Sequence, residues 1–165
     1  MEHDVIYHER FTAKGFIAIL SPITVFMLVI MMYHLLVESA EPFLFWTLFY
    51  ITIFIAFLLL TINFATLTIT MTSESITVGF GILKRKIPIV NIADCNRDDV
   101  SSVKYGGFGI RVAKIKGKKR LVYNTIGTPR VLLSLKEGRF PEFVFSTKSP
   151  EEVINVIRAQ LSLTR

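Results

Sequence analysis

Two long stretches without a charged side chain constrain the fold of this 165-residue chain more than any other feature. No Asp, Glu, Lys or Arg occurs in residues 16–37 or in residues 43–72. The first stretch has 22 residues, and as an α-helix it would be about 33 Å long, close to the roughly 30 Å hydrocarbon core of a bilayer. The sequence therefore predicts two membrane-spanning helices, at 16–37 and 43–64.

The residues beside each span bear on this interpretation. Arg10 and Lys14 precede the first span, as basic residues precede a cleaved signal peptide. The apolar region of a signal peptide is usually only about 7 to 15 residues long, so the length of the stretch favours a spanning helix. Trp46 and Tyr50 lie near the start of the second span, where aromatic residues of the membrane interface are expected.

The short connection between the spans predicts a helical hairpin with a defined orientation. Residues 38–42 contain two acids and no Lys or Arg. Arg10 and Lys14 precede the first span and all other Lys and Arg residues follow the second, so they lie at the open end of the hairpin, opposite this connection. The positive-inside rule then places both termini in the cytoplasm. We therefore expect a multi-pass plasma-membrane protein whose residues 1–15 are a cytoplasmic tail. The sequence does not decide whether the apolar residues of this tail lie along the membrane or pack on the following domain.

From Ala65 onward the pattern changes to short runs rich in β-branched residues. Apolar and Thr residues alternate in residues 67–72, which is typical of a half-buried strand, and a second strand at 75–81 would complete a hairpin. Pro88 indicates a sheet edge or a bulge in one of the later strands. Further strands are predicted at 86–92, 109–115, 120–123, 131–135 and 143–146.

Residues 149–161 are predicted to form a closing helix. Ser149 is a suitable N-cap, Pro150 fits the first helical position, and two acids occupy the first turn. Residues 65–165 are therefore expected to form one small antiparallel β domain with a C-terminal helix, following the membrane hairpin without a flexible linker.

Three local phrases resemble those of bacterial pleckstrin-homology-like (PH-like) membrane proteins. They are residues 81–88 followed by Ile92, residues 105–111, and residues 146–152 at the start of the last helix. The resemblance implies a small antiparallel PH-like β-barrel with a C-terminal capping helix, and hence an α+β fold behind the helical hairpin. Because these phrases are structural, the resemblance implies no particular biochemical activity.

The sequence lacks the motifs of the usual catalytic and cofactor sites. Gly106, Gly107 and Gly109 precede a predicted strand and lack the Lys-Ser/Thr pair of a phosphate-binding loop, so they are expected to form a structural turn with positive φ angles. Cys95 is the only cysteine, which excludes an internal disulfide and a cysteine-based metal cage. We expect no catalytic residue, no cofactor, no metal site and no enzymatic activity.

One acidic cluster occurs in the predicted domain, at Asp94, Asp98 and Asp99. Its spacing does not match a calcium-binding loop. We expect an exposed turn in which these acids pair with Arg97 and Lys104.

Basic residues carry the main functional signal. Residues 84–139 contain 14 Lys and Arg against 4 Asp and Glu. A basic domain held near a bilayer is attracted to anionic lipid headgroups, each basic residue contributing about 1 kcal/mol. Lysines on edge strands also prevent aggregation between sheets, and the sequence leaves both roles open. The candidate headgroup ligands are Lys84, Arg85, Lys86, Lys114, Lys116, Lys118, Lys119 and Arg120.

These observations favour a non-enzymatic membrane-anchored module that scaffolds or docks partners at the cytoplasmic face. An anionic-lipid sensor that uses the basic surface and a small accessory subunit of a larger membrane complex are the alternatives. The expected partners are membrane lipids and either a membrane protein or a second copy of the chain. Nucleic acid is not expected, because no recognition motif or interleaved stacking aromatics accompany the basic residues.

Overall fold

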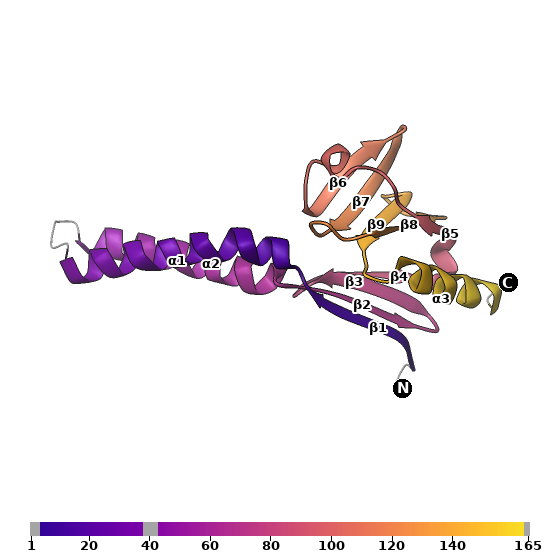
Figure 1. Cartoon of the computed structure of the whole chain (residues 1–165), viewed down its shortest axis with the longest axis horizontal. Coiled ribbons are helices and arrows are strands. Elements are labelled where there is room, and N and C mark those ends of the chain that lie inside the picture. The colour runs from indigo at the N-terminus through magenta and orange to yellow at the C-terminus, as the bar shows by residue number, and fades with distance from the viewer. Residues whose placement is uncertain (1–3, 38–42, 164–165) are drawn as a thin grey trace.

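The computed structural model describes residues 4–37 and 43–163 and has two parts (Figure 1). Two long helices, α1 (Lys14–Val37) and α2 (Phe43–Phe64), lie side by side, and a β-rich domain follows at one of their ends. Both helices are long and apolar enough to cross a membrane, judged by length and composition. The two predicted helices are thus confirmed, with α1 beginning slightly earlier than expected.

Sheet A lies directly beyond the two helices. Its strands β1 (Val5–Thr12), β2 (Thr66–Thr72), β3 (Ser75–Phe80) and β4 (Leu83–Pro88) follow one another in that order, and all neighbours are antiparallel. β2 and β3 form the predicted hairpin. Their alternating apolar residues face inward and are fully buried, whereas the threonines of β2 lie on the opposite face.

β1 differs from the sequence prediction, which expects only a tail in this region. Tyr7 and Phe11 pair with buried residues of β2, and Glu9 lies between them on the same face. The Glu9 carboxylate accepts hydrogen bonds from the Thr147 hydroxyl (2.5 Å) and the Lys148 backbone N–H (2.7 Å). Glu9 also accepts a hydrogen bond from the Tyr7 hydroxyl (3.0 Å). A charged residue in the inward-facing row hides the strand pattern in the sequence, because two of its three partners are 138 and 139 residues away.

Sheet B contains the remaining five strands and lies beside sheet A (Figure 1). The order is β5-β8-β9-β7-β6, with β7 and β9 parallel and all other neighbours antiparallel. The bounds are β5 (Ile92–Arg97), β6 (Gly109–Ile115), β7 (Lys118–Asn124), β8 (Arg130–Leu135) and β9 (Glu142–Ser146).

The two sheets do not close into the barrel that the resemblance implies. β4 is an outer strand of sheet A and β6 an outer strand of sheet B, and each pairs on one side only within the described part of the chain. Pro88, which lacks an N–H, ends β4, and a 3₁₀ turn, η1 (Ile89–Asn91), leads into β5. The strand predicted at 86–92 is therefore divided between the two sheets.

The core lies between the inward faces of the sheets and the C-terminal helix α3 (Pro150–Leu163). Val153 and Ile157 of α3 are fully buried in this core. A chain of ring contacts extends into it from the helices, from Phe64 to Phe80 (centroids 5.2 Å apart) and from Phe80 to Tyr123 (6.3 Å). Aromatic packing thus connects the base of the helices with the centre of the domain.

The helices pass into sheet A through a hydrogen-bonded junction. The Ala13 N–H, between β1 and α1, donates to the Ala65 carbonyl, between α2 and β2, at 2.8 Å. The Asn63 side-chain oxygen accepts a hydrogen bond from the Ile82 N–H (2.9 Å). Gly81 has a φ of +47°, and a Cβ there would lie only 2.3 Å from that oxygen. These contacts hold the β3–β4 turn against the end of α2.

Polar side chains also join the two helices to each other. The hydroxyl groups of Thr24 and Thr61 are 2.8 Å apart, and His34 Nε2 lies 3.2 Å from the Thr47 hydroxyl. The Tyr50 ring packs 5.1 Å from the His34 ring and stacks on Trp46 at 6.2 Å. Trp46 and Tyr50 lie in the first half of α2, toward the end that is remote from the β domain.

Candidate functional site

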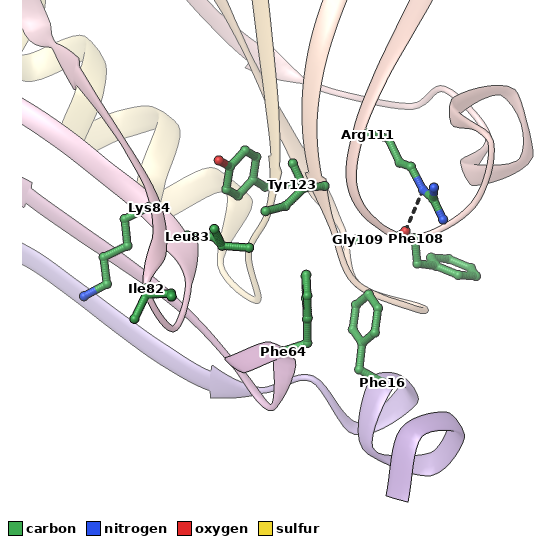
Figure 2. A pocket seen from close by; sticks show the side chains of 10 residues that line it. Phe16, Phe64, Ile82, Leu83, Lys84, Phe108, Gly109, Arg111 and Tyr123 are labelled. Atoms are coloured by element: carbon green, nitrogen blue, oxygen red, sulfur yellow. Dashed lines mark hydrogen bonds between the residues drawn. The ribbon is translucent and has the colours of Figure 1, made fainter. Parts of the chain in front are cut away.

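A pocket of about 610 Å³ lies where the helices meet the β domain (Figure 2). Its walls come from the first turn of α1, the end of α2, the β3–β4 turn, the start of β6, and β7. We call it the junction pocket. It is lined by Phe16, Phe64, Ile82, Leu83, Lys84, Phe108, Gly109, Ile110, Arg111 and Tyr123.

Aromatic rings from both helices form one wall of the junction pocket. The Phe16 and Phe64 rings have centroids 5.5 Å apart, and both pack on Phe80, at 5.6 and 5.2 Å. Since Phe80 is fully buried, the two helix residues are fixed against the core. The pocket therefore has a preformed apolar surface directly at the base of α1 and α2.

Two cations border the junction pocket on different sides. Lys84 lies on β4 and Arg111 on β6, and Figure 2 shows aromatic residues between them, with the Lys84 ammonium at the rim and directed away from these rings. Arg111 Nε donates a hydrogen bond to the Phe108 carbonyl (3.0 Å), which holds the guanidinium beside the aromatic wall. Neither cation forms an ion pair with any carboxylate in the described ranges.

Tyr123 contributes a further polar group. Its side chain is only 7% exposed and lines the junction pocket, but within residues 4–37 and 43–163 its hydroxyl has no hydrogen-bond partner. Burial raises the pKa of this phenol, although the nearby charge of Arg85 opposes the shift. At neutral pH the hydroxyl is therefore protonated, and it is available to donate a hydrogen bond to a ligand.

A second hollow of about 290 Å³ continues the junction pocket along the flank of the helices. Ile19, Leu20 and Leu60 add an apolar wall, and Arg111 borders both spaces. Ile126, in the β7–β8 loop, also lines the hollow and packs so closely on α1 that a Cβ on Gly15 would lie 2.5 Å from its side chain. Together the two spaces offer apolar walls beside the helices and a guanidinium between them.

The predicted basic residues occupy three different environments. Lys84, Arg85 and Lys86 lie on the edge strand β4, and only Lys84 borders the junction pocket. Lys114, Lys116, Lys118 and Lys119 lie at or near the β6–β7 turn, which points away from the helices (Figure 1).

Arg120 does not belong with the other predicted headgroup ligands, because it is buried. Its exposed fraction is 7%, and its Nε atom donates to the Glu142 carboxylate at 2.5 Å. Its Nη1 atom lies 3.3 Å from Asp98 Oδ1. Nη1 also donates to the Tyr105 hydroxyl (2.7 Å), so all three guanidinium contacts are internal and Arg120 has a structural role.

Asp98 corrects the expectation of an exposed acidic turn. It accepts hydrogen bonds from the Tyr105 hydroxyl (2.8 Å) and Arg130 Nε (2.8 Å), and it also pairs with Arg120. Burial and the bond to Asp98 raise the pKa of Tyr105 to about 12. Asp99, by contrast, is exposed and pairs with Arg97 at 3.5 Å. We call Asp98, Tyr105, Arg120, Arg130 and Glu142 the buried network.

The glycine-rich segment leads into the junction pocket. Gly106 and Gly107, in the connection before β6, and Gly109, the first residue of β6, have φ angles of +75°, +102° and +94°. This connection places Phe108 at the pocket. The sequence did not identify Arg111 as a site residue, although it ends one of the phrases that carry the family resemblance.

Within the described ranges, no three His, Cys, Asp or Glu residues are grouped as a metal site would require.

Comparisons of the chain with protein-family models, with curated proteins and with solved structures give no match.

Proposed function

We propose that this protein is a non-enzymatic membrane-anchored module that binds an anionic lipid in the junction pocket. The observation that carries this proposal is an aromatic pocket at the base of two apolar helices, bordered by two cations that pair with no carboxylate among the described residues. A phospholipid has the same two-part chemistry, with apolar chains and a charged headgroup. At the surface of a bilayer such a molecule is already present at high local concentration.

We assign a role to each wall of the junction pocket. An acyl chain would lie along Ile19, Leu20 and Leu60 on the flank of the helices. The phosphate would lie beside Arg111, and Lys84, whose side chain leaves β4 on the outward face of sheet A, would add positive potential at the rim of the pocket. Near an anionic surface each cation contributes about 1 kcal/mol. The Tyr123 hydroxyl is a hydrogen-bond donor for an oxygen of the same headgroup.

The orientation of the protein is part of the proposal. With α1 and α2 crossing the bilayer, the β domain lies at the face that carries Arg10 and Lys14, which the positive-inside rule assigns to the cytoplasm. The cytoplasmic leaflet is also the one rich in anionic lipid. We further propose that the chain is related to the PH-like membrane proteins and that it acts as a scaffold or as an accessory subunit of a larger membrane complex. A module that binds lipid at its membrane anchor could serve in each of these roles.

Native mass spectrometry of the full chain, extracted from mixed anionic and zwitterionic membranes, tests the proposal. We expect retained phosphatidylglycerol or cardiolipin, and a loss of about tenfold in the Lys84→Gln/Arg111→Gln double variant. The matched control is Lys114→Gln/Lys119→Gln, which removes the same charge near the β6–β7 turn. Equal lipid retention by both double variants would contradict the proposal.

A further inference from the structure

The outer edge of β4, residues 83–88, is open in the structure. β4 pairs with β3 along its inner side, and no described strand pairs with its other side. The backbone N–H and C=O groups of an outer strand can pair with an added chain. β4 therefore offers a row of main-chain donors and acceptors at the side of sheet A.

The exposed side chains of β4 carry charge of one sign on both faces of the sheet. Arg85 pairs across the sheet with the buried Val78 and so lies on the inward face, whereas Lys84 and Lys86 alternate to the outward face. Residues 75–93 contain no Asp or Glu. An added strand would therefore meet cations on either face.

Apolar surface is exposed at both ends of this edge. Ile82 is 89% exposed just before β4, and Val90 is 63% exposed just after it. Val90 also lines a hollow of about 430 Å³ together with Lys86 and Pro88. Lysine on an edge strand protects against aggregation, but protection does not account for large exposed apolar residues at each end.

We propose that the outer edge of β4 binds an extended acidic segment of a partner protein, which adds a strand to sheet A. Acidic side chains of that segment would face Lys84, Arg85 and Lys86, and its apolar ends would cover Ile82 and Val90. A second copy of the chain does not fit this edge, because two β4 strands would place like charges opposite each other. The proposal goes beyond lipid binding and stands or falls separately from it.

The test uses the full chain in phosphatidylcholine nanodiscs and fluorescent peptides of about eight residues, a usual strand length. An alternating Val-Glu peptide is the probe. We expect it to bind, and we expect no binding of an alternating Val-Lys peptide. A Val-Glu peptide in which every backbone amide is N-methylated keeps the charge but has no backbone N–H on either edge to donate, so its affinity should fall by about tenfold or more.

Variants locate the site. Arg85→Glu/Lys86→Glu should weaken the Val-Glu peptide by about tenfold, whereas Arg10→Glu, on β1 at the opposite edge of sheet A, should leave it unchanged. Arg111→Gln changes a residue of β6, outside the proposed strand site, so it should leave the peptide affinity unchanged even if it loses lipid, which separates the two proposals. Equal binding of the N-methylated peptide to the unaltered protein would overturn strand addition. Equal effects of the β4 and β1 variants, or a homodimer that excludes the peptide, would also overturn the proposal.

Discussion

The buried network and the junction pocket both contain arginine, but they use it differently. In the network, Arg120 and Arg130 are enclosed and face the carboxylates of Asp98 and Glu142. In the pocket, Arg111 faces aromatic rings and has no carboxylate partner among the described residues. Paired and buried arginines hold a fold together, whereas an unpaired arginine beside apolar walls is available to an anionic ligand.

Removing the central acid of the network should have the largest effect on stability. Asp98→Asn leaves Arg130 buried without a compensating charge, so the free energy of unfolding should fall by about 3–5 kcal/mol. Urea denaturation in detergent, followed by circular dichroism, measures this loss. Asp99→Asn is the control, since Asp99 is exposed and should change stability little. Similar losses for both variants would show that the network is not what stabilises sheet B.

The pH dependence of stability sharpens the same distinction. Because the pKa of Tyr105 is raised from 10.0 to about 12, the folded protein holds this proton more tightly than the unfolded chain. The resulting stability is complete below pH 10 and is lost as the pH rises towards 12, by about 2 kcal/mol at most. Tyr105→Phe should make this alkaline decrease shallower. An unchanged slope in denaturation curves between pH 9 and 12 would contradict this role.

The junction hydrogen bond should have a smaller effect. Asn63→Ala removes the acceptor of the Ile82 N–H and should cost about 1 kcal/mol. The β3–β4 turn borders the junction pocket, so lipid retention should decrease slightly as well. Hydrogen exchange should show faster exchange of the Ile82 amide while amides at the centre of β2 stay protected. Unchanged exchange at Ile82 would mean that this bond does not hold the turn.

Charge removal near the β6–β7 turn should have the smallest effect. Lys114→Gln/Lys119→Gln changes two exposed side chains on neighbouring strands, so stability should stay within about 0.5 kcal/mol of the unaltered protein. The same variant should retain lipid. Thermal denaturation and lipid analysis of one preparation check both expectations, and loss of lipid would move the binding surface to the turn.

The sequence predicts those parts of the fold that rest on local periodicity. The uncharged stretches place α1 and α2, and the alternation in residues 67–72 places β2. β1 was missed because Glu9 interrupts its apolar row, and besides the nearby Tyr7 hydroxyl the carboxylate binds distant residues just before α3. The open gap between β4 and β6 is likewise a property of tertiary pairing, which periodicity does not encode.

The candidate site was predictable only in part, for a related reason. Counting basic residues finds Lys84 and Arg120 equally well, but burial and pairing separate them. Arg111 is a single cation between apolar residues, so it adds little to a count of charges. Its role depends on the glycine turn that places Phe108 and the start of β6 against the helices.

Photocrosslinking with an anionic lipid that carries a diazirine on its acyl chain tests the central claim most directly. The full chain is labelled in membranes, and the modified residues are mapped by mass spectrometry. Lipid in the junction pocket predicts labelling concentrated at Ile19, Leu20, Leu60 and Phe108, lost in Lys84→Gln/Arg111→Gln and absent with a zwitterionic probe. Labelling spread evenly around α1 and α2, and indifferent to headgroup charge, would contradict a specific lipid site.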